Sequence, residues 1–272
     1  MSVFQVAVLA SGSKGNATLV RCSSGMVLID MGVSCRRITQ GMKALGLAPE
    51  DLDGVFFTHE HTDHVKGIVT FAKKYEVPLY ASKGTWEGIR QSVRGFDLQG
   101  TNWNLMPRSV ELDSLTVRGF AISHDAREPL GYALELGEHK FVYLTDTGFV
   151  SDPVRRELDG AEVMVLEANH DVDMLRNGSY PVALKTRILG VNGHLANEMT
   201  AEVILGMERK PREVFLAHLS QENNTPHKAL ATVQGKVLRH APEADIRFYI
   251  AKQDETVMNQ EWGDAIEQNM FE

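Results

Sequence analysis

The chain has 272 residues, of which 43% are hydrophobic and 24% are charged, so it is not mostly disordered and is long enough for one large domain or two small ones. The 28 basic and 36 acidic residues leave a formal charge of −8, which argues against coating of nucleic acid through bulk electrostatics. No apolar stretch approaches the roughly 20 residues that span a bilayer, no secretory signal pattern opens the sequence, and Cys22 and Cys35 are too few for a disulfide framework. We therefore expect a cytoplasmic protein with no membrane partner.

The first half of the sequence predicts strands separated by turns rich in Gly, Ser and Asn, followed by helices that alternate with strands. The expected strands are 4–10, 17–21, 26–30, 55–58 and 78–81, and the expected helices are 36–45, 65–75 and 85–93. The helix over 65–75 is indicated by apolar residues at Val65, Ile68, Val69 and Ala72, which have helical spacing.

The second half of the sequence predicts a similar arrangement in mirrored order. Three antiparallel strands are expected at 114–122, 131–136 and 139–144, then strands at 163–167, 213–217 and 246–250, with helices after Ser151-Asp152-Pro153 and over 198–207 and 225–238. No linker or low-complexity segment separates the halves. We therefore expect residues 1–272 to form a single domain with two lobes, made of sheets with helices on their outer faces.

The segment His59-Glu60-His61-Thr62-Asp63-His64 follows the apolar run Val55-Phe56-Phe57 and is dense in metal-binding side chains. On an extended backbone His59 and His61 point the same way and can bind one ion, while Asp63 and His64 can turn toward a second. A solvated polar loop is the alternative interpretation. The density of imidazoles favours a metal site, since sparser patterns already serve as metal signatures.

Three later polar residues each end a predicted strand in the same way. His124 follows the apolar run 119–123, Asp146 follows 141–145, and His218 follows 214–217. Any one of them alone is more often a turn residue or a hydrogen-bonded core histidine. Together with the histidine segment they make seven ligands, the number that a two-metal site needs when one carboxylate bridges.

With these residues the chain resembles the metallo-β-lactamase fold superfamily over nearly its whole length, and the HxHxDH pattern is intact. The resemblance implies an α/β fold, a four-layered αββα sandwich of two mixed sheets with helices on the outer faces and the site between the sheets. It also implies that His59, His61 and His124 hold one metal ion, that Asp63, His64 and His218 hold the other, and that Asp146 bridges them. Asp30 matches the first family motif and would orient a ligand, although a turn aspartate is an equal alternative.

The position of Asp146 distinguishes the branches of this superfamily. Most β-lactamases of this fold have cysteine there, so Asp146 indicates a two-metal hydrolase of a phosphodiester, thioester or lactone. His124 and Asp146 are 22 positions apart, and Asp146 and His218 are 72 apart. The second interval is too short for a β-CASP insertion, and the first leaves no room for a ribonuclease Z exosite arm.

Four longer strings, 10–16, 167–171, 193–197 and 217–224, resemble the YycJ/WalJ branch, whose members are compact bacterial proteins regarded as exonucleases. That resemblance implies a two-metal-dependent phosphodiesterase or nuclease, an exonuclease that cleaves DNA by metal-activated water. Zn²⁺, Mn²⁺ and Fe²⁺ all suit imidazole and carboxylate ligands. Two alternatives stay open: a glyoxalase II-like thioester or lactone hydrolase, and a metal-binding regulatory protein without turnover.

Further residues are assigned to catalysis and substrate binding. Asp63 would help to orient the nucleophile, and His194, in the family string Gly-His-Leu-x-Asn, would donate a proton to the leaving oxygen. His170 is an alternative donor or a phosphate contact, and either histidine could instead be structural. In the loop 11–16 we expect Ser11, Ser13, Lys14 and Asn16 to contact a phosphate, with a plain hairpin turn as the equal alternative.

Overall fold

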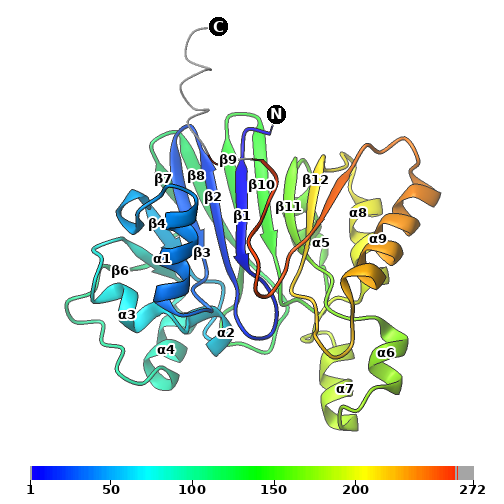
Figure 1. The fold of residues 1–272 in the computed structure, drawn as a ribbon, viewed down its shortest axis with the longest axis horizontal. Coiled ribbons are helices and arrows are strands. Elements are labelled where there is room, and N and C mark those ends of the chain that lie inside the picture. The colour runs from blue at the N-terminus through cyan, green and yellow to red at the C-terminus, as the bar shows by residue number, and fades with distance from the viewer. Residues whose placement is uncertain (1, 261, 263–272) are drawn as a thin grey trace, which may run out of the picture.

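The computed structural model describes residues 2–260 and 262, which form two seven-stranded sheets packed face to face (Figure 1). The first sheet contains, in spatial order, β14 (Val257–Met258), β1 (Gln5–Ala10), β2 (Ala17–Cys22), β3 (Gly25–Ile29), β4 (Gly54–Phe56), β5 (Leu79–Ala81) and β6 (Trp103–Leu105). The second sheet contains β13 (Arg247–Ile250), β12 (Glu213–Ala217), β11 (Val163–Glu167), β10 (His139–Leu144), β9 (Leu130–Leu136), β8 (Leu115–Ala121) and β7 (Ser109–Leu112).

Both sheets are mixed, as the sequence predicted. The strands from β3 to β6 pair in parallel, and so do those from β10 to β13, whereas the remaining pairs are antiparallel. Parallel strands need crossover connections, which here are mostly helical. The carboxyl ends of these parallel strands lie at one edge of each sheet, where a ligand site is commonly built.

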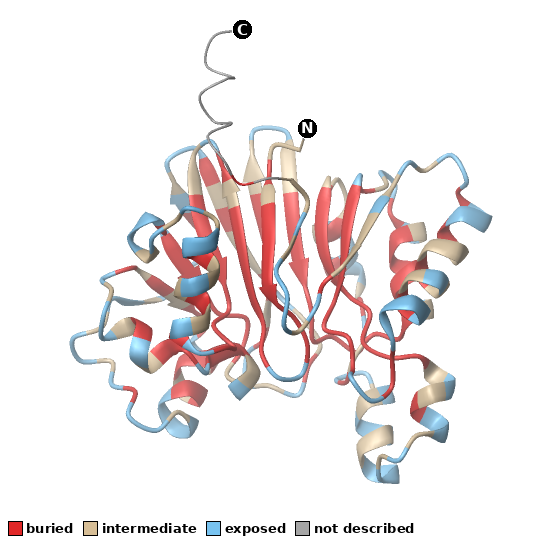
Figure 2. Ribbon diagram, in the orientation of Figure 1, coloured by how far each residue is buried: buried red, intermediate tan, exposed pale blue. Residues whose placement is uncertain are grey.

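The helices cover the outer faces of the two sheets and complete four layers. The first sheet is covered by α1 (Cys35–Ala44), α3 (Ile68–Ala72) and α4 (Lys83–Ser92), and the second by α5 (Asp152–Leu158), α8 (Asn197–Gly206) and α9 (Pro226–His240). Figure 2 shows buried residues along the strands and on the inner sides of these helices. None of the helices in the described part of the chain is long and apolar enough to cross a membrane.

Alternation along β1 shows how the sequence produces these layers. Val6 and Val8 belong to the core between the sheets, whereas Ala7 and Leu9 belong to the core between the first sheet and its helices. Successive side chains of a strand point to opposite faces, so a strand that is apolar at every position must be covered on both sides. The αββα sandwich expected from the sequence is therefore confirmed.

The single helix expected over 65–75 is wrong. The structure has two short helices there, α2 (Thr62–Val65) and α3, separated at Gly67. The Gly67 amide donates to Met31 O at 2.8 Å, and a Cβ on Gly67 would lie 2.6 Å from Val33 O. The loop after β3 thus packs against the backbone at Gly67, a long-range contact that helical periodicity does not reveal.

Several short elements were not predicted from the sequence. They are the edge strands β6 and β14, the strand β7, and two helices, α6 (Val172–Asn177) and α7 (Val182–Leu189). Periodicity over three to eight residues is a weak signal, and α7 has no buried residue to define an apolar face. The two cysteines, Cys22 and Cys35, are buried and unpaired.

Candidate metal centre

The candidate site lies where strands of both sheets end, and three of its residues have unusual backbone conformations. Asp30 follows β3, Asp146 comes two residues after β10, and His218 follows β12, with φ of 62°, 58° and 53° respectively. This left-handed conformation is costly for residues other than glycine and is found preferentially at functional sites. Here it turns each chain sharply at the strand end, beside the histidine segment that follows β4.

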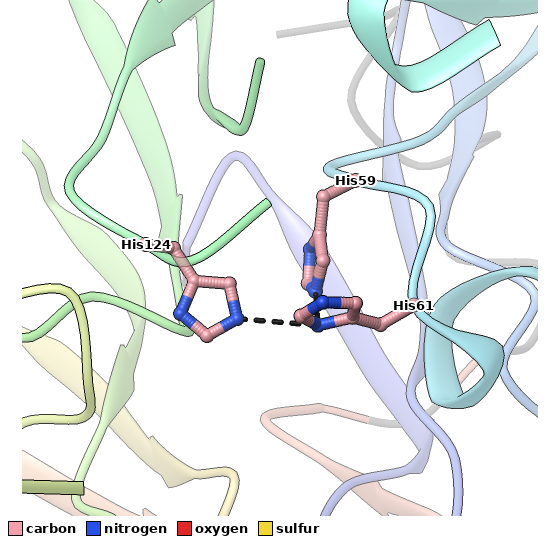
Figure 3. A group of neighbouring side chains, drawn as sticks. All are labelled: His59, His61 and His124. Atoms are coloured by element: carbon pink, nitrogen blue, oxygen red, sulfur yellow. Dashed lines mark hydrogen bonds between the residues drawn. The ribbon is translucent and has the colours of Figure 1, made fainter. Parts of the chain in front are cut away.

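His59, His61 and His124 form the first ligand group (Figure 3). His61 Nδ1 lies 3.0 Å from His59 Nε2 and 3.3 Å from His124 Nε2, so three ring nitrogens converge from both sheets. Burial, together with the neighbouring imidazoles, holds the pKa of His59 well below its usual value and lowers that of His124. Both rings are therefore in the neutral form that binds metal ions.

Asp63, His64 and His218 form the second ligand group. Asp63 Oδ2 lies 3.5 Å from both His64 Nε2 and His218 Nε2. Asp146 lies between the two groups: its carboxylate is 3.3 Å from His64 Nε2, 3.2 Å from His218 Nδ1 and 4.0 Å from His124 Nε2. The seven residues chosen from the sequence are thus brought together, with Asp146 between the two groups.

The carboxylates and imidazoles of the second group and Asp146 influence each other's protonation. Burial opposes ionisation of Asp63 and Asp146, but the neighbouring imidazoles outweigh it and lower the pKa of both carboxyls. Burial likewise opposes protonation of His64 and His218, but Asp146 and the other carboxylates raise the pKa of His64 well above its usual value and that of His218 to about 10.

Two buried atoms of this group, Asp146 Oδ2 and His218 Nε2, make no hydrogen bond within the described residues. A buried polar atom without a partner is costly unless a ligand satisfies it. Imidazole and carboxylate donors around these atoms fit divalent cations.

Asp30 and Thr58 fix the orientation of His64. Asp30 Oδ2 accepts a hydrogen bond from His64 Nδ1 at 2.7 Å, and its Oδ1 accepts from the Thr58 amide at 2.8 Å. Burial raises the pKa of Asp30, and the nearby His64 opposes that shift. Because Asp30 holds Nδ1, His64 Nε2 is directed toward Asp63 and Asp146. This is the arrangement expected if the Asp30 carboxylate orients His64.

The buried residues of the loop 11–16 make hydrogen bonds to the segments that carry the candidate ligands. Ser11 Oγ accepts from the His218 amide at 2.7 Å, and Asn16 Nδ2 donates to Asp63 O at 3.2 Å and lies 3.1 Å from His64 Nε2. Ser13 and Lys14 are exposed. Of the four residues predicted to contact substrate, two therefore bind the ligand loops and two face solvent.

Close backbone packing explains the glycines around this loop. A Cβ on Gly32 would lie 1.6 Å from Asp63 O, and one on Gly15 would lie 2.3 Å from Gly32 O. Gly15 also has a φ of 150°, which side chains rarely permit. The three loops can therefore meet at Asp63 because Gly15 and Gly32 have no side chains at these contacts.

Glu167 is a site residue that the sequence analysis missed. It is fully buried at the end of β11, and its Oε1 accepts hydrogen bonds from His194 Nδ1 at 2.7 Å and His218 Nδ1 at 3.1 Å. Its Oε2 accepts from the amides of Thr147 and Leu195 at 3.0 and 3.1 Å. A charged residue that ends a wholly apolar strand was the available signal, the same one that identified the residues after β10 and β12.

Glu167 and His194 influence each other's protonation. Burial opposes ionisation of Glu167, but His194 and His218 outweigh it and hold the pKa of the carboxyl well below its usual value. Burial also opposes protonation of His194, but Glu167 and Asp146 raise its pKa. Glu167 thus favours the protonated form of His194 and holds its Nδ1 beside the ligand groups.

His170 differs from His194 in its surroundings. Its side chain is buried, Nδ1 lies 3.3 Å from Asn169 Oδ1, and Nε2 has no hydrogen-bond partner among the described residues. Burial lowers its pKa to about 4. At neutral pH His170 is therefore uncharged, which makes it a poor proton donor.

Comparison with known proteins places this geometry in context. The family model of the β-lactamase superfamily domain matches residues 26–219. Exodeoxyribonuclease WalJ of Streptococcus pneumoniae is 37% identical over 233 residues, which cover 85% of this chain and 87% of the relative. Exodeoxyribonuclease YycJ of Bacillus anthracis is 37% identical over 227 residues, or 83% and 86% of the two chains.

Solved structures share the fold at much lower sequence identity. The metallo-β-lactamase fold protein YhfI of Bacillus subtilis has a TM-score of 0.66 and 17% identity, covering 94% of this chain and 99% of its own. Zn²⁺-bound PqqB of Methylobacterium extorquens has a TM-score of 0.64 and 17% identity, covering 93% and 99%.

Proposed function

The chain belongs to the β-lactamase superfamily, and from this we propose that it is a two-metal-dependent phosphodiesterase that acts as an exonuclease on DNA. The observation that carries the proposal is the convergence of two ligand groups on Asp146, beside the His194–Glu167 pair. The relatives that are 37% identical over most of the chain are named exodeoxyribonucleases, which supports DNA as the substrate.

The proposed ligands of one ion are His59, His61 and His124, and those of the other are Asp63, His64 and His218, with Asp146 shared. When bound, two divalent ions supply an acidified water molecule and positive charge for the phosphate oxygens. Zn²⁺ and Mn²⁺ are the proposed metals, and Fe²⁺ suits the same ligands.

His194 is the proposed general acid. Glu167 holds its Nδ1, so Nε2 can donate a proton to the oxygen that leaves phosphorus. The raised pKa of His194 favours the protonated form that this role requires. Asp63, which faces the second ligand group, is proposed to orient the attacking water, and the exposed Ser13 and Lys14 to contact the DNA backbone.

The remaining parts of the proposal concern substrate contacts, organisation and location. We also assign substrate binding to three buried residues beside the candidate ligands: Ser11, Asn16 and the uncharged His170. Residues 1–272 are proposed to form one domain of two lobes without a β-CASP insertion, which the core shared by the two sheets supports. The unpaired thiols suit a reducing cytoplasm, the proposed location.

The test is to incubate metal-loaded protein with end-labelled single-stranded and duplex DNA, RNA and S-lactoylglutathione, in Mn²⁺ and in Zn²⁺. We expect progressive shortening of DNA from an end. A His194→Ala variant should retain metal and lose most of the nuclease turnover. Hydrolysis of the thioester without shortening of any nucleic acid would assign the protein to the glyoxalase-like alternative instead.

A further inference from the structure

Helix α7 lies near the metal centre but contributes neither a candidate ligand nor a buried residue. None of its residues is buried, and together with α6 it projects beyond the ends of the sheets (Figures 1 and 2). It is nevertheless attached to the site. Arg187 Nε donates to Asp125, next to the ligand His124, and Ile188 O accepts from the His194 amide at 3.0 Å. These contacts attach α7 to the residues beside the metal centre.

A pocket of about 180 Å³ lies between α7 and the metal centre. Its α7 side is apolar, since Leu184 and Ile188 are four residues apart and share one helix face, with Tyr180 preceding them. Its other side presents the polar residues Asn169, Asn192 and His194. The proposed general acid thus forms part of the wall, so whatever fills the pocket lies against His194.

The pocket has polar atoms that no protein group uses. Tyr180 Oη, Asn192 Nδ2 and Ser13 Oγ make no hydrogen bond within residues 2–260 and 262, whereas Asn192 Oδ1 is held by Ser123 Oγ at 2.9 Å. A fixed amide with a free donor is the kind of group that reads the edge of a ligand.

The chemistry of the lining favours a nucleobase over a phosphate. Among the described lining residues the basic side chains are Arg187 and His194, and each is already paired with a carboxylate, Arg187 with Asp125 and His194 with Glu167. Phosphate sites use unpaired cations or clustered amides. Tyr180, Leu184 and Ile188 offer a surface to the π-face of a flat ring, and the polar groups that make up most of the lining offer partners to its hydrogen-bonding edges.

We propose that this pocket binds the base of the single nucleotide released at each cleavage, at the end of the strand that the enzyme attacks. The proposal rests on the nuclease function proposed above. At about 180 Å³ the pocket is smaller than the roughly 300 to 1,000 Å³ of sites that enclose drug-sized ligands, so it holds one base and excludes a base pair. Binding of one unpaired base beside the scissile bond accounts for removal of nucleotides one at a time.

The experiment compares two oligonucleotides that differ only in the attacked terminal nucleotide, which carries either a base or a tetrahydrofuran abasic residue. The protein variants are the wild type, Leu184→Trp, which fills the pocket, and Val182→Trp as the matched control. Val182 is on the same helix, is 79% exposed and does not line the pocket. Bis(p-nitrophenyl) phosphate, which has no base, reports the metal centre alone.

We expect the wild type to lose at least about tenfold in kcat/KM on the abasic end, the order of effect of losing one stacked base. Leu184→Trp should lose as much on the normal end and little more on the abasic end. Val182→Trp should match the wild type on both ends, and these two proteins should hydrolyse bis(p-nitrophenyl) phosphate within about twofold of each other. A base preference that is absent in the wild type, or that survives in Leu184→Trp, overturns the proposal.

Measurements of oligonucleotide affinity distinguish failure of the pocket proposal from failure of the proposed nuclease function. If the metal-loaded wild type hydrolyses neither DNA nor bis(p-nitrophenyl) phosphate, the nuclease proposal fails by itself. The affinities of the same two oligonucleotides for the same three proteins, measured by fluorescence anisotropy, then decide the pocket. Tighter binding of the end that carries a base, lost only in Leu184→Trp, supports the pocket, and equal binding of both ends overturns it.

Discussion

Glu167 is the residue through which the metal centre and the proposed general acid are joined, because its Oε1 contacts both His194 and His218. We predict that Glu167→Gln lowers kcat by about 10- to 100-fold, the range seen when partners of metal-site histidines are removed. Loss of the carboxylate also lowers the pKa of His194, so the alkaline limb of the kcat profile should move to lower pH. Rate measurements between pH 6 and pH 9 test both effects.

The matched control for this change is Glu162→Gln. Glu162 precedes β11 at its opposite end, and its carboxylate contacts His139 Nδ1 at 3.0 Å. Glu162→Gln therefore removes a Glu–His contact at the other end of β11. The rate and pH profile of this variant should match those of the wild type. If Glu167→Gln behaves like Glu162→Gln, Glu167 has no part in catalysis.

The protonation of the second ligand group predicts that metal binding releases protons. In the metal-free protein the pKa of His218 is raised to about 10, so its ring is charged at pH 8, and the pKa of His64 is raised well above its usual value, which also favours its charged form. A metal ion binds neutral imidazole, so these protons must leave, and affinity should rise with pH up to about pH 10. Asp63 and Asp146 remain ionised throughout and contribute no protons.

Calorimetric titration of Zn²⁺ at pH 8 in two buffers with different ionisation enthalpies measures this release. We expect different observed heats in the two buffers, and smaller differences as the pH approaches 10. Identical heats in both buffers at pH 8 would show that neither ring gives up a proton.

At the scale of elements, the sequence predicted the long strands and long helices well and the short helices and edge strands poorly. The strands β10, β11 and β12 are apolar runs covered on both faces, so composition alone defines them. The break between α2 and α3 was missed because it depends on a contact with Val33, some 30 positions away in sequence. Local periodicity contains no information about such a partner.

This break predicts opposite effects for two glycine-to-alanine changes. Gly67→Ala places a Cβ 2.6 Å from Val33 O, and we expect a loss of about 1 to 3 kcal/mol in the free energy of unfolding. Gly235→Ala lies within α9 with its nearest contact at 3.4 Å, and should gain about 0.4 to 1 kcal/mol by restricting the unfolded chain. Urea unfolding of the metal-loaded proteins measures both, and equal stability of Gly67→Ala and wild type would contradict the packing explanation.

At the scale of the whole molecule, the proposed metal ions link the two sheets. His59 and His61 follow a strand of the first sheet, whereas His124 follows a strand of the second. Removing the metal should therefore destabilise the fold as a whole. At a free metal concentration about 1,000 times the Kd, binding contributes about 4 kcal/mol. That corresponds to a fall in Tm on the order of 10 °C when the metal is chelated.

Thermal unfolding with Zn²⁺ and with EDTA tests this link. The wild type and His139→Ala, a change at an unrelated histidine, should both lose stability on chelation. His124→Ala should show a smaller difference between the two conditions, since one sheet then contributes fewer ligands. An unchanged Tm of the wild type in EDTA would contradict a metal link between the sheets.

Local patterns predicted the sheets with outer helices and the seven candidate ligands, because apolar runs that end in His or Asp lie within short stretches of sequence, and the family resemblance supplied the four-layered arrangement. The tertiary structure was needed to show that these side chains lie close together, that Glu167 holds His194, and that α7 lines a pocket beside them. These facts depend on which strand ends lie side by side and on loops that meet at Gly15 and Gly32. Spatial neighbours of this kind are set by the packing of the two sheets, which no short stretch of sequence contains.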